Sequence, residues 1–505
     1  MPDYDYVIVG AGSAGSVVAN RLISADPSLQ VLLLEAGGAD SKPEIFIPSA
    51  LPALFGTEVD WAYLTEPEPG LDGRQIYHPR GKVLGGSSAI NGMIYIRGNR
   101  QDFDRWEAAG NVGWSYEQVL PYFIRAEGNS RGADPYHGGD GPLAVSDNPA
   151  LDPRSETFLE AAKELGLPEN PDFNGAEQEG FGPFQVNIRA GRRITSAEAY
   201  LKPVLGEPNL EVVTHALATK IVLTDGRASA LDYVHDGKTI RADVRRELIL
   251  CAGAFESPKL LMLSGIGPAG HLSQLGVPVT VDLPGVGANL HDHPRIDIAF
   301  GNPSPTDIDP ASNILEVAGF LNTSSDPEGP DVQFHYAMTL VNPALLDRGP
   351  GWQIIVCPTR PRARGEVRLK SADPADHPSL TFNYLTEAQD VATLLRGLAV
   401  AREIGMADAF ASIRGDELYP GADVRDEQGL EACLRQMMDS EYHPVGSCRM
   451  GVDEDAVVDP QLRVRGVEGL RIADASIFPE ITSGNTNAAT VMVGEKAADL
   501  ILQSD

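Results

Sequence analysis

Cysteine and long apolar runs are both scarce in this sequence of 505 residues. None of its four cysteines belongs to a C-x-x-C pair, so we expect free thiols and no disulfide framework. No apolar run reaches the roughly 18 residues that a membrane-spanning helix requires, and the first residues lack the basic and apolar parts of a signal peptide. We therefore expect a cytoplasmic protein without a transmembrane segment.

Positively charged residues are also scarce relative to acidic ones. The chain carries 40 Lys and Arg residues against 71 Asp and Glu residues, which gives a formal net charge of −31. Such a surface repels nucleic acid and anionic lipid, so we expect no nucleic-acid partner. Hydrophobic residues make up 42% of the sequence, as is typical of a globular protein, and the length favours two or more domains.

Histidine and cysteine do not gather at the spacing of a metal site. His291 and His293 form a pair, but they follow a turn rich in glycine and proline, and no third ligand lies nearby. His443 and Cys448 share one short stretch, in which no C-x-x-C or H-x-x-x-H pattern completes a tetrahedral set. We therefore predict no metal site, and His443 stays open between a packed core histidine and a catalytic base.

The chain does contain a βαβ unit at its start. Apolar runs predict strands at Tyr4–Gly10 and Gln30–Gly37, and residues at helical spacing predict a helix at Ser13–Ser24 between them. The glycine spacing of this unit recurs at 265–270. That second stretch follows a predicted helix and contains Pro268, so we interpret it as a helix end and a turn.

A glycine motif joins the first strand to the first helix. Gly10, Gly12 and Gly15 follow the pattern G-x-G-x-x-G, whose glycines permit a tight turn and close approach of the backbone to a pyrophosphate. The helix N-terminus faces the phosphates, and Glu35 at the end of the second strand is placed to accept a hydrogen bond from a ribose hydroxyl. The unit predicts a bound adenine dinucleotide and leaves FAD and NAD as alternatives.

Strand-like segments return to this unit later in the chain, which indicates an interrupted domain. Asn209–Leu223 and Arg245–Phe255 read as strands, whereas Asp331–Leu340 alternates like a strand of a different sheet. We predict an α/β fold in which a Rossmann-type nucleotide-binding domain is interrupted by a substrate domain. The first domain is assigned residues 1–150, 191–300 and 430–505, and the second is assigned residues 151–190 and 301–429.

Four further stretches together resemble one protein family. Gly81–Gly98 and Gly253–Gly267 resemble the two signatures of the glucose–methanol–choline (GMC) oxidoreductases. Tyr442–Gly451 and Arg471–Ile501 resemble the C-terminal active-site region of that family, and the motifs run in order from residue 4 to about residue 503. The resemblance implies an FAD cofactor, alcohol oxidation, and a substrate domain built on an antiparallel sheet with helices. Within the family the chain looks most like choline dehydrogenases and choline oxidases.

The resemblance also implies which residues contact FAD. Small residues let the backbone approach the cofactor, and the last helix, which we expect to begin at Asn487, aims its positive end at the flavin. Some choline oxidases carry a histidine bonded to FAD where this chain has Ile90, so we expect noncovalent FAD. The expected cofactor residues are Gly10, Gly12, Ser13, Ala14, Gly15, Glu35, Ala36, Trp61, Gly81, Val83, Gly86, Ser87, Asn91, Gly92, Met93, Ile94, Thr219, Ala252, Gly253, Asp474, Ala475, Asn487, Ala488 and Thr490.

His443 matches the active-site histidine of the family, and Asn487 matches its polar partner. The resemblance implies that His443 takes the hydroxyl proton of an alcohol while the flavin takes the hydride from the carbon. Asn487 is then expected to hydrogen-bond the developing alkoxide, and Tyr442 to form a wall of the pocket. His335 matches another active-site histidine of the choline oxidase branch and stays open between lining the pocket and packing across strands.

Two neighbouring positions leave the substrate open. Leu315 stands where choline oxidases carry a tryptophan of the aromatic cage around the ammonium group, although Glu316 still offers a negative charge to the expected pocket. The substrate is therefore a choline-like amino alcohol or a neutral sugar, glycoside or aryl alcohol. A lyase (oxynitrilase or decarboxylase) and a flavin protein without catalysis remain alternatives on the same fold. We expect O2, a quinone or another carrier as electron acceptor, and the oligomeric state stays open.

Overall fold

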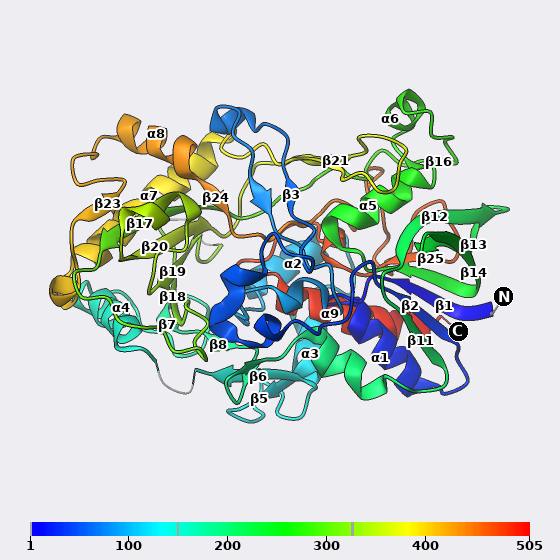
Figure 1. Ribbon diagram of the computed structural model, residues 1–505, viewed down its shortest axis with the longest axis horizontal. Coiled ribbons are helices and arrows are strands. Elements are labelled where there is room, and N and C mark those ends of the chain that lie inside the picture. The colour runs from blue at the N-terminus through cyan, green and yellow to red at the C-terminus, as the bar shows by residue number, and fades with distance from the viewer. Residues whose placement is uncertain (1–2, 149–150, 325–327, 505) are drawn as a thin grey trace.

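The computed structural model describes residues 3–148, 151–324 and 328–504, in which two seven-stranded sheets carry the fold (Figure 1). The strands of the first sheet, at the right of Figure 1, are in order β11 (Leu210–Val213), β2 (Val31–Leu34), β1 (Asp3–Val9), β14 (Lys238–Leu250), β13 (Arg227–His235) and β12 (Leu217–Thr224), with β25 (Leu470–Ile472) beside β14. The strands β11, β2, β1, β14 and β25 run parallel, whereas β12, β13 and β14 form an antiparallel meander. This sheet therefore combines segments from the start, middle and end of the chain.

The predicted βαβ unit is present in this sheet. β1 and helix α1 (Gly15–Ala25) lie close to their predicted positions, but β2 ends at Leu34, earlier than the sequence predicts. The chain turns away there, since the N–H of Gly37 donates a hydrogen bond to the Glu35 carboxylate (2.8 Å). Helix α9 (Asn487–Leu502) packs on α1, and an ideal Cβ on Gly494 would lie 2.9 Å from the carbonyl oxygen of Ala14, so only glycine permits this approach.

The second sheet, at the left of Figure 1, is antiparallel throughout. Its strands are in order β23 (Glu417–Tyr419), β17 (Pro294–Gly301), β20 (Gly351–Pro358), β19 (Val332–Ala337), β18 (Val317–Leu321) and β7 (Gly180–Pro183), with β24 (Asp439–Ser440) beside β17. Helix α7 (Ala388–Met406) covers one face and contacts α4 (Pro153–Glu164) and α8 (Glu427–Met437). An α/β fold with an antiparallel second sheet is thus confirmed.

The chain crosses between the two sheets several times, as the predicted domain pattern requires. β24 pairs with β17 of the second sheet, although residues 430–505 were assigned to the first domain. The division into domains at the predicted residues stays a prediction. In the described part of the chain, no helix is both long and apolar enough to cross a membrane.

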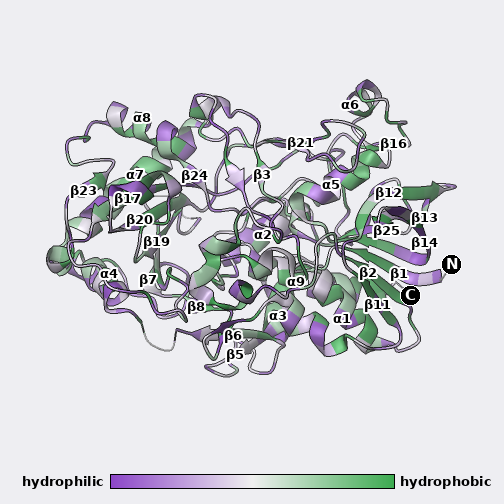
Figure 2. Ribbon diagram, in the orientation of Figure 1, coloured by the Kyte–Doolittle hydropathy of each residue, from purple (hydrophilic) through white to green (hydrophobic). Residues whose placement is uncertain are grey.

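Shorter elements connect the two sheets and complete the core. The remaining helices are α2 (Arg100–Ala108), α3 (Tyr116–Ala126), α5 (Gly253–Leu263) and α6 (Ala269–Gln274). The remaining strands are β3 (Tyr63–Leu64), β4 (Tyr77–His78), β5 (Glu127–Asn129), β6 (Leu143–Asp147), β8 (Gln185–Val186), β9 (Ile188–Arg189), β10 (Arg192–Arg193), β15 (Ile266–Gly267), β16 (Val281–Asp282), β21 (Glu366–Arg368) and β22 (Ser379–Thr381). Figure 2 shows β2, β11 and β12 as hydrophobic strands, and all four residues of β2 are buried, as expected for a parallel strand covered on both faces.

Candidate active site

A cavity of about 630 Å³ extends from the carboxyl ends of β1, β2 and β14 to β17 of the second sheet. Open α/β sheets bind ligands at this edge, where the loops that follow the strands leave a crevice. The lining residues come from both ends of the chain, from the first glycine loop to the start of α9. One end of the cavity is therefore shaped by the first sheet and the other by the second.

The end of the cavity beside β1 is formed largely by backbone. Gly10 has a φ of +99°, in the left-handed region that favours glycine, and begins the turn into α1. An ideal Cβ on Gly86 would lie 2.7 Å from the Cα of Gly12, so the two glycine loops almost touch. Ser13 and Ala14 at the N-terminus of α1 line the same space, which is the arrangement that binds a pyrophosphate.

Glu35 lies at the end of β2, where the sequence predicts an acceptor for the hydrogen bond of a ribose hydroxyl. Its carboxylate accepts hydrogen bonds from the N–H groups of Ala11 (3.0 Å) and Gly37 (2.8 Å), and the residue lines the cavity. Burial raises the pKa of this carboxyl group to about 7, against the opposing effect of both hydrogen bonds. A carboxylate has about four lone-pair sites, so these two bonds leave capacity for a ribose hydroxyl. The residues present at this end fit an adenine dinucleotide.

Most of the predicted cofactor residues line this cavity. They are Gly10, Gly12, Ser13, Ala14, Glu35, Ala36, Trp61, Gly81, Gly86, Ser87, Asn91, Gly92, Met93, Ile94, Ala252, Gly253, Asp474, Ala475, Asn487 and Thr490. The other four are not among the lining residues, and their part in cofactor binding stays a prediction. Gly15 is packed against the Gly10 carbonyl, Val83 and Ala488 are buried in apolar clusters, and the Thr219 hydroxyl donates to the carbonyl of Asp232 (3.0 Å).

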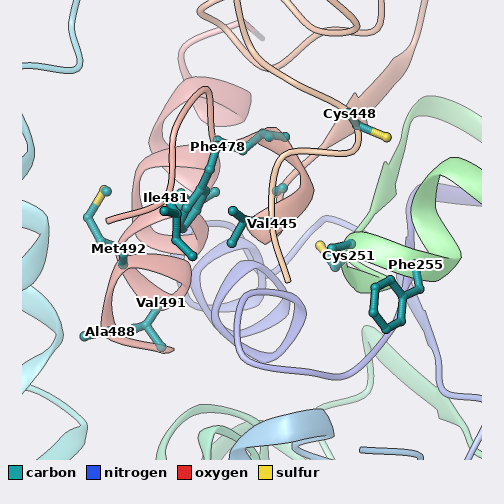
Figure 3. Packing of buried hydrophobic residues seen from close by; sticks show 14 of the residues in the cluster. Cys251, Phe255, Val445, Cys448, Phe478, Ile481, Ala488, Val491 and Met492 are labelled. Carbon is teal, nitrogen blue, oxygen red and sulfur yellow. The ribbon is translucent and has the colours of Figure 1, made fainter. Parts of the chain in front are cut away.

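Two segments that are distant in sequence pair at the other end of the cavity. The backbone of His291 exchanges hydrogen bonds with that of Val445, and the N–H of Glu441 donates to the carbonyl of His293 (3.0 Å). This pairing brings residues 291–294 against the segment that contains His443. Figure 3 shows Val445 and Cys448 in the same buried cluster as Phe478 and Ile481, next to α9.

Asp292 anchors the backbone of His443. Its carboxylate accepts hydrogen bonds from the N–H of His443 (2.7 Å), from the hydroxyl of Tyr384 (2.5 Å) and from the hydroxyl of Ser440. The guanidinium of Arg80 donates to the carbonyl of Tyr442 on the other side. The backbone that carries His443 is therefore fixed by buried partners on both sides.

The imidazole of His443 lies in the cavity wall and has a partner on each ring nitrogen. Its Nδ1 is 3.0 Å from Nδ1 of His293, and its Nε2 is 3.2 Å from Nδ2 of Asn485. Burial lowers the pKa of His443 well below its usual value, and nearby His293 and Arg80 lower it further. The ring is therefore neutral near pH 7 and able to accept a proton.

The side chain that contacts His443 is not that of Asn487, whose predicted role toward the substrate stays a prediction. The polar contact to Nε2 comes from Asn485, whereas the side-chain oxygen of Asn487 accepts a hydrogen bond from the hydroxyl of Ser13 (2.7 Å). Asn487 is the first residue of α9, as predicted, so its side chain reaches across to the glycine loop at the N-terminus of α1. Asn485 lies in the turn before that helix and faces the second sheet.

Two of the four expected substrate residues lie elsewhere. Leu315 and Tyr442 line the cavity, but His335 and Glu316 do not. His335 is fully buried on β19 and packs against Phe184, with ring centroids 5.4 Å apart, but its Nε2 also lies 3.9 Å from the carboxylate of Glu441 in the cavity wall, so its role stays open. Glu316 is saturated, because its carboxylate accepts hydrogen bonds from the backbone of residue 152 and from the hydroxyls of residues 155 and 312.

A different charged pair faces the cavity. Glu441 lines it beside Arg295, whose Nη1 is 3.6 Å from the carboxylate of Glu441 and whose Nη2 is 3.2 Å from that of Asp439. Burial raises the pKa of Glu441 to about 7, although Arg295 opposes the shift. The substrate end of the cavity thus has a cation and a titratable acid in its wall.

Five residues of this site were missed from the sequence, namely Arg80, His293, Arg295, Glu441 and Asn485. Residues 485–487 contain two asparagines, and only the turn before α9 determines which of them contacts His443. In the sequence, His293 stands out only as half of a histidine pair without a third metal ligand. No sequence pattern near it indicates the backbone pairing that brings it to His443. Among the described residues, no group of three or more His, Cys, Asp or Glu side chains is placed to hold a metal ion.

Comparison with known proteins identifies one family over most of the chain. Models of the N-terminal and C-terminal parts of the GMC oxidoreductases match residues 4–295 and 361–494. An oxygen-dependent choline dehydrogenase of Sinorhizobium medicae (strain WSM419) is 43% identical, over 99% of this chain and 95% of the relative.

Solved structures agree over the whole chain. The structure of pyridoxine 4-oxidase from Mesorbium loti is 35% identical with a TM-score of 0.93, covering 98% of this chain and 99% of that one. An FAD-dependent oxidoreductase from Chaetomium thermophilum is 26% identical with a TM-score of 0.91, covering 99% of each chain.

A nucleotide-binding sheet that shares its cavity with a second, antiparallel sheet is the arrangement of a dinucleotide-dependent oxidoreductase. The chain belongs to the GMC oxidoreductase family. It is an oxidoreductase that acts on CH–OH donors, and its cofactor is FAD.

Proposed function

We propose that His443 is the base that takes the hydroxyl proton of the alcohol, at Nε2. The O–H bond breaks and an Nε2–H bond forms, while the C–H hydrogen leaves the carbon with its electron pair. Bound FAD supplies the acceptor for that hydride. The observation that carries this proposal is the neutral, buried His443 ring in the cavity wall, with Nε2 beside Asn485. Positioned proton transfer of this kind contributes about 10²–10⁴-fold to a rate.

Asn485 assists the proton transfer because its amide positions the alcohol oxygen next to His443. The amide Nδ2 of Asn485 lies 3.2 Å from Nε2, so an alcohol oxygen that displaces this contact meets both a proton acceptor and an N–H donor. The donor stabilises the alkoxide character that develops as the proton leaves. Asn487 is assigned to holding the cofactor loop instead, through Ser13.

The substrate is proposed to be a neutral alcohol with an apolar or aromatic body. The outer wall of the cavity is apolar, and Leu346 on its rim is exposed to solvent. Its residues are Leu51, Pro52, Phe55, Val341, Pro343 and Leu346. Such a wall favours an aryl alcohol over a sugar or glycoside, because the hydroxyls of a sugar lose their water there without new partners.

A choline-like amino alcohol is the second candidate. Three of the aromatic rings that line the cavity lie close together, with the ring centroid of Phe55 6.0 Å from that of Tyr442 and 6.4 Å from that of Tyr77. Aromatic faces and the acid Glu441 are the groups that bind a quaternary ammonium ion. The choline dehydrogenases at 43% identity support the same reading.

Anaerobic bleaching of the flavin band separates these candidates. We would mix the FAD-loaded protein with benzyl alcohol, choline, or 3,3-dimethylbutan-1-ol, the neutral isostere of choline. Faster bleaching by benzyl alcohol and by the isostere than by choline supports a neutral substrate. Faster bleaching by choline than by its isostere overturns that proposal in favour of the cation. Product formation without bleaching and without an acceptor indicates a lyase.

The electron acceptor is proposed to be O2 or a quinone-type carrier. The relatives named above as oxygen-dependent support O2. Ile90 lines the cavity and offers no nucleophile for a covalent bond, which supports noncovalent FAD at this position. Hydrogen peroxide released during turnover in air, compared with reduction of a quinone analogue without air, identifies the acceptor.

A further inference from the structure

His443 belongs to a continuous row of hydrogen-bonding groups behind the cavity. The row begins and ends beside β20, at the thiol of Cys357 and the carbonyl of Thr359. Its contacts are Cys357 Sγ to Gln333 Oε1 (3.7 Å), Gln333 Nε2 to Asn485 Oδ1 (3.3 Å), Asn485 Nδ2 to His443 Nε2 (3.2 Å), His443 Nδ1 to His293 Nδ1 (3.0 Å), and His293 Nε2 to Thr359 O (3.1 Å).

The hydrogen bond to Thr359 determines which ring nitrogen carries the proton in His293 and, through it, in His443. A backbone carbonyl only accepts, so His293 must carry a proton on Nε2 to donate to Thr359. Burial lowers the pKa of His293 to about 4, so the ring is neutral and its Nδ1 is an acceptor. The contact between the two Nδ1 atoms then requires a proton on Nδ1 of His443, which leaves Nε2 of His443 without one.

The Cys357 end of the row leads to the same assignment. The thiol of Cys357 donates to Oε1 of Gln333, which turns the amide N–H of Gln333 toward Oδ1 of Asn485. Asn485 therefore presents an N–H to His443, and an N–H donor requires a bare nitrogen on the facing ring. The hydrogen bonds at both ends of the row therefore favour the same tautomer of His443.

We propose that His293 and Gln333 are positioning residues that hold His443 as its Nδ1–H tautomer, which keeps Nε2 in the cavity wall unprotonated and ready to accept the substrate proton once the alcohol displaces the Asn485 contact. The proposal deepens the proposed function and rests on it, because it concerns the state of the same base. Neither residue touches the reacting atoms. Both are fully buried, and each acts through one neighbour in the row.

The row holds a proton in place and does not conduct it. After His443 takes the substrate proton on Nε2, its Nδ1–H still donates to His293 and stabilises the imidazolium. His293 cannot pass a proton further, because the Thr359 carbonyl beyond it has no capacity to bind one. The other charged or titratable groups that face this pair are Arg80, His335, Asp292 and Glu441.

The tautomer can be measured directly by nitrogen-15 NMR of protein labelled at histidine. His291 is the internal reference for an Nδ1–H ring, since its Nδ1 donates to the carbonyl of Asn289 (2.6 Å) and its Nε2 accepts from the N–H of Ile481 (2.9 Å). We expect His443 to share that pattern and His293 to show the opposite one, with signals assigned from the variants His443→Gln and His293→Gln. A neutral His443 protonated at Nε2 would overturn the proposal.

A matched pair of variants tests the consequence for the reaction. His293→Gln keeps a hydrogen-bond acceptor and donor in the buried position, whereas His293→Met has similar length, has no donor and accepts only weakly through its sulfur. We expect anaerobic flavin reduction to slow on the order of 10²–10⁴-fold in the Met variant, and most of the rate to return in the Gln variant. Flavin content is measured in both variants, and rates are compared per bound flavin.

The outcomes separate this proposal from the proposed function. Equal rates in the Gln and Met variants, with His443 still in its Nδ1–H form, would overturn the role of His293. Loss of activity in His293→Met with a change in the NMR tautomer supports it. If His443→Gln reduces its flavin at the rate of the unmodified protein, the proposed base itself fails, whatever the NMR pattern of His293.

Discussion

At the scale of single residues, Asn485 and Asn487 illustrate how a separation of two positions changes a role. Asn485 contacts the base, and Asn487 contacts Ser13 of the glycine loop. Both residues line the same cavity, so a sequence motif that covers both cannot distinguish them. The distinction comes from the start of α9, which turns the side chain of its first residue toward α1.

Replacing each asparagine by alanine should therefore give different defects. Asn485→Ala removes an N–H donor beside the reacting oxygen and should lower the rate of anaerobic flavin reduction on the order of 10²–10³-fold with FAD retained. Asn487→Ala breaks the bond between α9 and the glycine loop and should first lower FAD content. Stopped-flow reduction and the ratio of flavin to protein absorbance measure the two effects. The reverse distribution of defects would restore Asn487 as the partner of His443.

The pKa of Glu35 makes FAD binding dependent on pH. The carboxyl group of the empty protein titrates near pH 7, and a ribose hydroxyl donates best to its ionised form. Affinity should therefore rise as pH rises through 7 and be roughly tenfold higher at pH 8 than at pH 6. Fluorescence titration of the apoprotein with FAD measures this change, and Glu35→Gln should lose it. An unchanged slope in Glu35→Gln would assign the pH dependence to another group.

Single-residue chemistry was predictable where a motif fixes the backbone. Glu35 and the glycines of the first loop could be placed because the βαβ unit dictates their geometry. Glu316 could not, since its three hydrogen-bond donors come from residues 152, 155 and 312, and nothing local indicates that its carboxylate is already saturated.

At the scale of elements, two stretches with the same glycine spacing have different structures. The third glycine of the first motif, Gly15, begins α1, and an ideal Cβ there would lie 1.9 Å from the carbonyl oxygen of Gly10. The third glycine of the second stretch, Gly270, lies in α6 with open space around its Cα. The preceding element distinguishes them, since β1 leads into the first motif and α5 into the second.

Alanine at these two glycines is a matched test of that difference. Gly15→Ala should destabilise the fold by about 1–3 kcal/mol through overpacking and lower the FAD content. Gly270→Ala should be neutral or stabilise by up to about 1 kcal/mol, because alanine favours a helix more than glycine does. Chemical denaturation of both variants with bound flavin removed gives the free energies. Equal destabilisation by the two substitutions would contradict the packing argument.

The elements themselves were predicted well where apolar patterns are clear, as for β1 and α1. The pairing between residues 291–293 and 441–445 was not predictable, because a few backbone hydrogen bonds join segments with no shared pattern. The base obtains its partner His293 through this pairing, so the least predictable contact in the fold is also one that the site depends on.

At the scale of the whole molecule, one cavity joins the two sheets. FAD that binds there contacts segments from both ends of the chain and should stabilise the folded state by mass action. At a free FAD concentration of 100 Kd the gain is about 2.7 kcal/mol. Calorimetry of the protein with and without FAD should show a higher melting temperature for the loaded form. An unchanged melting temperature would mean that FAD binds the unfolded chain equally well.

The order in which the site residues occur along the chain has a consequence for biosynthesis. The glycine loop leaves the ribosome at residues 10–15, yet β14, the neighbour of β1, ends only at Leu250, and the base and its amide follow at His443 and Asn485. At about 5–20 residues per second, the interval between the loop and Asn485 is roughly half a minute to a minute and a half. The cofactor site is therefore complete only after the last helix has been synthesised. A chain that ends a few dozen residues early lacks α9 and Asn485 and should be inactive.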